Sequence, residues 1–184
     1  GEPLLEAALI EKICDYWFAE CFRRGVPLAP FTRISFATNG KLWFSQEAQH
    51  LFEKYHELMS VTISIDGIQE LHDRYRIDAD GNGSFSTAWA AFQDAKSKYG
   101  WTFVPGSFRY IADSIKMMLD EGCTDIACNY AYEPVYTPAD GLALYEQMKS
   151  VSDYIISKQL DVSITMLDDI LGGKAMNNNN FCGG

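Results

Sequence analysis

Polar residues that can bind a small molecule stand at the ends of the predicted strands of this 184-residue chain. Over residues 60–66, apolar residues alternate with polar ones, so Ser64 and Asp66 face away from the apolar side. Asn39 closes the preceding predicted strand and Asn129 lies near the end of a later one. Hydroxyl, carboxylate and amide groups can between them donate to and accept from a polar ligand. This pattern predicts a ligand site at the strand ends.

The cysteines, in contrast, show no spacing that indicates a metal site. The five are Cys14, Cys21, Cys123, Cys128 and Cys182, an odd number without a CxxC pair. Cys14 and Cys21 lie two helical turns apart, and Cys128 alternates with apolar residues in a predicted strand. We expect these three to be buried small apolar residues. Reduced thiols are typical of a cytoplasmic protein, which is the predicted location.

Alternating amphipathic and β-rich segments must position these residues. The predicted helices span about 4–24, 45–59, 84–99, 107–121 and 137–160, and the predicted strands span about 33–38, 60–66, 101–104 and 125–131, with a polar loop over 67–83. Such alternation predicts an α/β fold of parallel strand–helix units, with chemistry at the carboxyl ends of the strands. The first helix has no strand before it, so we expect at least one strand before Gly1.

Charge and hydropathy exclude two classes of partner. The formal net charge is −10 at pH 7 and the sequence pI is about 4.7. Nucleic-acid binding needs clustered Lys and Arg, so no nucleic-acid partner is expected. The sequence has no apolar run long enough to span a membrane and no signal peptide at its start, so no membrane partner is expected.

Short motifs occur in order at the predicted strand ends. They are Gly1-Glu2-Pro3-Leu4-Leu5, Thr38-Asn39-Gly40, Ser64-Ile65-Asp66-Gly67, His72-Asp73 with Arg76, and Gly83-Ser84-Phe85. In this order they resemble motifs of the radical S-adenosylmethionine (SAM) superfamily, in the branch that holds anaerobic sulfatase-maturating enzymes and peptide maturases. The first resembles the end of the family's GGEPLL motif and the second its TNG motif. Each motif is common alone, and the ordered set is specific.

The resemblance implies a partial (β/α)6 TIM-like barrel of parallel strands, with the first strands missing. It implies a barrel domain over 1–160 and the start of a truncated cysteine-rich C-terminal extension, the SPASM region, over 161–184. The last four residues, 181–184, resemble the beginning of that extension, so Cys182 would be its first cluster ligand.

The resemblance also assigns roles toward SAM. Gly1-Glu2 would hold its amino group, Ser64 a ribose hydroxyl, and Arg76 its carboxylate. Asn39 would belong to the same polar shell, and Asn129 would lie beside the adenine. Taken singly, Glu2 could be only a favourable acid at a helix start, and Arg76 only a solvated ion pair. His72 and Asp73 are expected to be loop structure, and no catalytic residue is assigned.

The implied reaction needs a 4Fe-4S cluster on a CxxxCxxC loop, which these 184 residues lack. That motif is expected before Gly1, and the partners of Cys182 in possible auxiliary 4Fe-4S clusters after Gly184. In the full-length oxidoreductase, the cluster would cleave SAM to a 5′-deoxyadenosyl radical that modifies a peptide or protein side chain. The electron donor would be a flavodoxin or ferredoxin. The chain alone is expected to be inactive and to aggregate through exposed apolar surface.

Two other functions stay open. The chain could be a non-catalytic barrel module that has lost its cluster and binds a peptide or protein partner. It could also be an unrelated β/α metabolic enzyme that uses Glu2, Asp66 and Glu133 as strand-end carboxylates.

Overall fold

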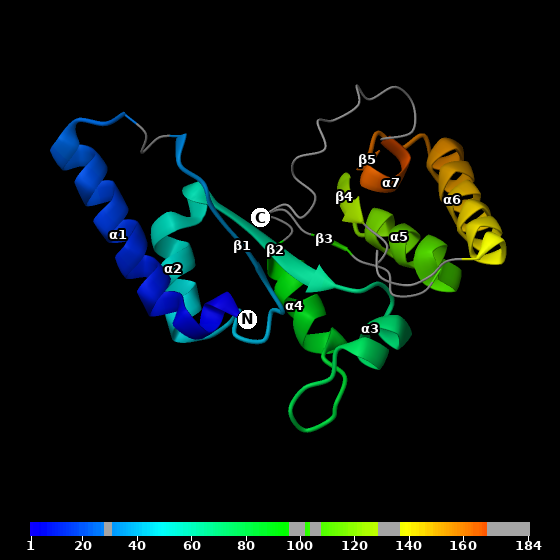
Figure 1. Cartoon of the computed structure of the whole chain (residues 1–184), viewed down its shortest axis with the longest axis horizontal. Helices are drawn as coiled ribbons and strands as arrows, with labels where there is room; N and C mark the ends of the chain where they lie inside the picture. Colours follow the sequence, from blue (N-terminus) through cyan, green and yellow to red (C-terminus); the bar gives the residue numbers. More distant parts are fainter. Residues whose placement is uncertain (28–30, 96–101, 104–107, 129–136, 169–184) are drawn as a thin grey trace.

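The computed structural model describes residues 1–27, 31–95, 102–103, 108–128 and 137–168 (Figure 1). It is an α/β structure in which helices connect the strands of one sheet. The elements are η1 (Pro3–Glu6), α1 (Ala7–Arg24), β1 (Ile34–Thr38), α2 (Gln46–Tyr55), η3 (His56–Leu58), β2 (Met59–Ile65), α3 (Gln69–Tyr75), α4 (Phe85–Ala95), β3 (Thr102–Phe103), η4 (Phe108–Tyr110), α5 (Ile111–Asp120), β4 (Asp125–Cys128), α6 (Pro138–Lys158), β5 (Ser163–Ile164) and α7 (Thr165–Asp168).

The sheet contains five parallel strands in the order β1-β2-β3-β4-β5. β1 and β2 form its longest pair, in register from Ile34 opposite Met59 to Thr38 opposite Ile63. Because all the strands run in one direction, their carboxyl ends lie along one edge, where ligands of parallel sheets bind. The predicted parallel α/β organisation is confirmed.

Strand β2 shows the predicted alternation. Val61, Ile63 and Ile65 are fully buried in the core, whereas Thr62 and Ser64 are half-buried on the opposite face. The core continues into α4, which contacts β2 and buries several alanines and Phe92. Small residues on α4 let the helix approach the sheet closely, a point that matters for the turn after β1.

Local capping chemistry sets several helix boundaries as the sequence predicted. The Ser45 hydroxyl accepts from the Ala48 N–H at 3.2 Å and starts α2. Thr137 and Asp140 form a reciprocal capping box at the start of α6. Gly25 ends α1 in the left-handed conformation.

The predicted polar loop over 67–83 is wrong in its first half, which forms helix α3. This helix has no side-chain N-cap, and it buries only Leu71 and His72, so it carries little amphipathic periodicity. Tertiary contacts stabilise it instead. The Ile68 N–H, just before the helix, donates to Ser114 Oγ of α5 at 3.1 Å. A short helix held from outside gives no clear sequence signal.

Helix α1 packs against α2 on one side and leaves apolar residues exposed on the other. We call these exposed residues, together with Leu5 of η1, the α1 outer face: Leu5, Leu9, Ile13, Tyr16 and Trp17. Their spacing places them along one stripe of the helix. Within the described ranges, no helix is both long enough and apolar enough to cross a membrane.

We expect Ile13→Glu to lower the binding of an environment-sensitive apolar dye, because it places a charge in the middle of the α1 outer face. Ile13 is 58% exposed, so the free energy of unfolding should change by no more than about 0.5 kcal/mol. The matched control is Ile156→Glu on α6, where the side chain is 73% exposed. Equal dye emission from wild-type protein and Ile13→Glu would show that the α1 outer face does not bind the dye.

Candidate functional site

The carboxyl end of β1 is tied to the amino-terminal segment by one carboxylate. Glu2 Oε1 accepts from the Thr38 hydroxyl at 2.6 Å and from the Leu4 N–H at 3.1 Å. Glu2 Oε2 accepts from the Asn39 N–H at 2.8 Å. The amino terminus therefore lies beside the end of β1 (Figure 1).

The two carboxylate oxygens of Glu2 differ in how many further hydrogen bonds they can accept. Each carboxylate oxygen offers two lone pairs. Oε1 uses both of its lone pairs, whereas Oε2 accepts one hydrogen bond from the described residues. Oε2 can therefore accept one further donor, such as an ammonium group of a ligand.

The turn after β1 is shaped by a close approach to α4. Gly40 has φ +78°, and an added Cβ there would lie 2.9 Å from the Ala91 Cβ and 3.2 Å from the Ala88 Cα. The Gly40 N–H donates to the Thr38 hydroxyl at 3.2 Å, and the Asn39 side chain accepts from the Lys41 N–H at 2.9 Å. Contacts within and around this turn thus account for each residue type of the Thr-Asn-Gly motif.

The carboxyl end of β2 carries a bidentate ion pair. Arg76 donates to Asp66 through Nε at 2.5 Å and through Nη2 at 3.1 Å. The Asp66 side chain is 14% exposed and that of Arg76 is 37% exposed. A guanidinium carries five N–H groups, so the pair leaves Arg76 donors for a ligand. Asp66 fixes the plane of the guanidinium while its far edge stays open.

His72 joins β2 to the segment after α3 from a fully buried position. Its Nδ1 accepts from the Asp66 N–H at 3.2 Å, and its Nε2 lies 3.0 Å from Ser84 Oγ. The Ser84 hydroxyl donates to the Arg76 carbonyl at 2.9 Å, so Nε2 must carry the proton and donate to Ser84. The ring is neutral. Burial lowers the pKa of His72, against an opposing effect of Asp66.

Residues 76–84 form a hairpin that returns the chain to α4. The Ser84 N–H donates to the Arg76 carbonyl at 3.1 Å, and the Asp78 N–H donates to the Asn82 carbonyl at 2.8 Å. The Asp78 carboxylate accepts from the N–H groups of Asp80 and Asn82, at 2.9 Å each. The bond from the Asn82 backbone is the largest of several causes that lower the pKa of Asp78.

Gly83, at the end of the hairpin, packs directly against the Asp73 carboxylate of α3. The Asp73 carboxylate accepts from the Phe85 N–H at 2.8 Å and so caps α4 from a neighbouring helix. A Cβ on Gly83 would lie 2.1 Å from the Asp73 Cγ, so any side chain there would displace the carboxylate. The prediction that His72 and Asp73 are structural is consistent with these contacts, although both lie on α3 and not in a loop.

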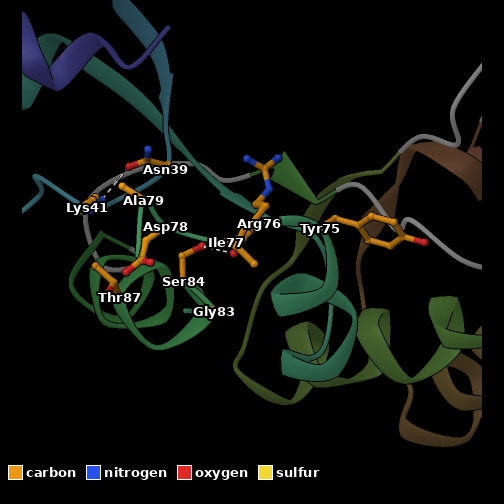
Figure 2. Close-up of a pocket in the computed structure, with 10 residues that line it drawn as sticks. All are labelled: Asn39, Lys41, Tyr75, Arg76, Ile77, Asp78, Ala79, Gly83, Ser84 and Thr87. Atoms are coloured by element: carbon orange, nitrogen blue, oxygen red, sulfur yellow. Dashed lines mark hydrogen bonds between the residues drawn. The ribbon is translucent and has the colours of Figure 1, made fainter. Parts of the chain in front are cut away.

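A cavity of about 450 Å³ lies between the turn after β1 and this hairpin (Figure 2). Its lining residues are Asn39, Lys41, Tyr75, Arg76, Ile77, Asp78, Ala79, Gly83, Ser84 and Thr87. This volume is in the range of small-molecule sites. In Figure 2, Asn39 and Arg76 project from the ends of separate elements, while the ring of Tyr75 is turned away from Lys41.

The structure thus brings Asn39 and Arg76 around one cavity, with Glu2 bonded to the backbone of Asn39. Ser64 is half-buried near the end of β2 and makes no side-chain hydrogen bond to the other described residues. Gly1 is exposed beside Glu2. Asn129, Glu133 and Cys182 lie outside the described residues. No sequence pattern singled out Lys41, which contributes a second cation to the cavity wall and follows the Asn-Gly turn directly.

The described cysteines do not fit a metal cluster. Cys14, Cys21 and Cys128 are buried and form no disulfide, as predicted for small core residues, and Cys123 is buried as well. No group of three or more metal-ligating side chains occurs in the described ranges. Burial raises the pKa of Cys128 to about 11 and also raises the pKa of Cys14, which opposes the thiolate form that binds metals.

The fold is similar to that of solved structures of anSMEcpe, an anaerobic sulfatase-maturating enzyme. The structure of anSMEcpe with bound AdoMet and the Cp18Cys peptide matches 78% of this chain, with a TM-score of 0.56 and 23% identity. Histidine-tagged anSMEcpe with bound AdoMet matches 72%, with a TM-score of 0.55 and 21% identity. The chain spans 45% and 40% of those chains.

The predicted resemblance is therefore confirmed at the level of the fold. No family model matches the sequence. A search of curated proteins gives no match either.

We expect Gly83→Ala to destabilise the protein by about 2 kcal/mol, because the added methyl group overlaps the Asp73 carboxylate. Urea denaturation measures the effect. The control is Gly141→Ala in α6, where an added Cβ meets nothing within 4 Å, so the helix should gain up to about 1 kcal/mol. Similar stability of wild-type protein and Gly83→Ala would refute the close approach.

Stability should fall as the pH drops below about 6.5, the ordinary histidine pKa, because buried His72 resists protonation. The unfolded chain takes up the proton first, so the contribution of His72 is present above that pH and is lost on acidification toward its lowered pKa in the folded protein. Free energies of unfolding between pH 5 and pH 8 measure this slope. His72→Gln should flatten it, whereas His56→Gln, at an exposed position, should leave it unchanged.

Proposed function

We propose that this chain is the SAM-holding part of a radical SAM enzyme that modifies a side chain of a peptide or protein. One observation carries the proposal. Asn39 after β1 and Arg76, which Asp66 holds at the carboxyl end of β2, line one cavity, and the Glu2 carboxylate is bonded beside it. The shared fold with anSMEcpe, solved with bound AdoMet and with a peptide, supports the same function.

The architecture that we propose is a partial (β/α)6 TIM-like barrel. Five parallel strands in sequential order, each followed by a helical segment, support this arrangement. The division into a barrel domain over 1–160 and a SPASM-like extension over 161–184 is part of the proposal. Residues 163 and 164 pair with β4 and so continue the sheet beyond residue 160.

We propose that Glu2 binds the SAM amino group. Its Oε2 atom keeps one lone pair for an ammonium donor, while the bonds from Thr38 and Leu4 hold the carboxylate in place. Gly1 would add its backbone carbonyl to the same site. SAM held there would be the source of the radical in the proposed side-chain modification.

Arg76 would bind the SAM carboxylate with the N–H groups that Asp66 leaves open. Two oxygens of a carboxylate fit the planar edge of a guanidinium. Asp66 would orient Arg76, and His72 and Ser84 would hold the backbone on either side of it. The role of these chain residues is therefore to bind and orient a zwitterionic ligand.

The remaining contacts complete the proposed site. Ser64, whose side chain has no hydrogen-bond partner among the described residues, would bind a ribose hydroxyl, and Asn39 would contribute its amide at the cavity wall. Asn129 would lie beside the adenine.

The cysteines of the described residues do not fit a 4Fe-4S cluster. Cys182 as an auxiliary-cluster ligand and a flavodoxin- or ferredoxin-type electron donor belong to the same proposal.

We expect Arg76→Lys to weaken SAM binding by about tenfold, because an ammonium cannot replace the bidentate geometry of a guanidinium. Glu2→Gln should weaken it similarly, because it removes the negative charge and leaves one oxygen where the Leu4 and Asn39 N–H groups donate to two. Isothermal titration calorimetry with SAM measures both. The matched control is Arg23→Lys on α1, an exposed arginine that pairs with Glu20. Unchanged SAM affinity in both site variants would refute the assignment.

The enzymatic activity is tested in the natural full-length protein, by the reductant-dependent formation of 5′-deoxyadenosine from SAM. We expect the product to form and to be lost with the variants that lose SAM binding. SAM binding without iron or product would instead favour the non-catalytic binding module.

A further inference from the structure

Two arginines gather around one buried tyrosine beside the candidate site. Arg74 lies on α3, and Arg109 and Tyr110 lie on η4. Tyr110 is buried, with Arg109 4.5 Å and Arg74 5.8 Å from the centre of its ring. We call Arg74 and Arg109 the arginine pair. Contacts of both cations with one ring fix them at the same place on the surface.

Glu70 and the Tyr110 hydroxyl orient the pair further. Arg74 Nη2 donates to Glu70 Oε1 at 3.2 Å and lies 3.4 Å from the Tyr110 hydroxyl. Arg109 Nη2 donates to the Tyr110 hydroxyl, which in turn donates to Glu70. Arg109 also lies 3.9 Å from Glu70 Oε1. One carboxylate therefore serves two guanidinium groups, and the group keeps one positive charge in excess.

The arginine pair is open to a ligand. The side chains of Arg74 and Arg109 are 43% and 65% exposed. Among the described residues, each guanidinium is bonded only through its Nη2 atom, so its Nε and Nη1 donors are open. A second carboxylate would bring the local charge to zero and accept from these donors.

The position of the pair places such a ligand near the candidate site. Helix α3 follows β2, and η4 comes after β3, so both elements lie on the carboxyl-end side of the sheet. Tyr75 and Ile77 follow Arg74 in the chain and line the 450 Å³ cavity. They are 58% and 63% exposed. Exposed apolar side chains therefore lead from the arginine pair to the cavity, which suits an extended ligand with acidic and apolar groups.

We propose that the arginine pair is a subsite for the carboxylate of an acidic side chain in a peptide that enters the cavity past Tyr75 and Ile77. The proposed function suggested a peptide as the ligand, so the inference rests on it in that respect. The positive charge of the arginine pair favours a peptide with an acidic side chain. In a chain with net charge −10, acidic peptides are repelled over most of the surface, and a local excess of positive charge determines where they dock.

The chain contains a matched control for this subsite. Arg23 and Arg24 also share one carboxylate, that of Glu20, and their side chains are 64% and 63% exposed. That trio lies on a single helix, α1, before β1. It has the same charge as the proposed subsite, but it lies away from Tyr75 and Ile77 in the chain and is not on a segment that follows a strand.

The test is fluorescence anisotropy with labelled decapeptides of Gly, Ser and Ala that carry either one Glu-Leu or one Gln-Leu pair. We expect the wild-type protein to bind the Glu peptide about tenfold more tightly than the Gln peptide. The double variant Arg74→Gln/Arg109→Gln should lose this preference and bind the Gln peptide unchanged. Arg23→Gln/Arg24→Gln should keep it. Thermal unfolding checks that each variant is folded.

Several outcomes would overturn the subsite. They are no binding of the Glu peptide, equal loss of both peptides in the Arg74/Arg109 variant, and loss of the preference in the Arg23/Arg24 variant. Inorganic phosphate that binds at the arginine pair when no peptide does would also exclude a peptide carboxylate. SAM affinity is measured in parallel and should not change in any of these variants. Arginine-dependent peptide binding in a protein that does not bind SAM would disprove the proposed function and leave the subsite intact.

Discussion

The candidate site depends on the buried, neutral imidazole of His72. Its Nδ1 accepts from the backbone after β2, and its Nε2 donates to Ser84, which donates to the carbonyl of Arg76. This chain of bonds ties the end of a strand, helix α3 and the start of α4 to each other. A buried polar network of this kind is stable only when every member is satisfied, so the neutral ring is a structural requirement. The backbone of Arg76 is therefore positioned by this network, while Asp66 holds its side chain.

Arg76 and Glu2 each make strong hydrogen bonds within the protein and still keep donors or acceptors for a ligand. Asp66 uses one edge of the guanidinium, and the backbone and hydroxyl donors around Glu2 use most, but not all, of its carboxylate. The entropic cost of ordering these side chains is therefore met on folding, before any ligand binds. Two preorganised groups of opposite charge, each bonded to a residue at the end of a neighbouring strand, suit a ligand that carries both an ammonium and a carboxylate.

Much of this fold could be predicted from local patterns. The alternation along β2, the Ser45 cap and the Thr137-Asp140 capping box are encoded by adjacent residues. Helix α3 could not, because contacts from α5 stabilise it and its own sequence buries few side chains. In the site, residue types at strand ends pointed to Asn39, whereas Arg76 was indicated only by the resemblance to the family's motifs. The bond from Thr38 to Glu2 joins residues 36 positions apart, and no local pattern encodes such a contact.

Cations follow three successive strands of an acidic chain. Lys41 comes after β1, Arg74 and Arg76 come after β2, and Arg109 comes after β3. Because the strands are parallel and in sequential order, these segments belong to one edge of the sheet. Residues 66–84 also carry five carboxylates, so the carboxylate groups of a ligand are favoured only where guanidinium donors are left open, at Arg76 and at the arginine pair. The sheet topology thus brings separate basic residues to one edge, where the carboxylates of Asp66 and Glu70 hold their guanidinium groups in defined orientations.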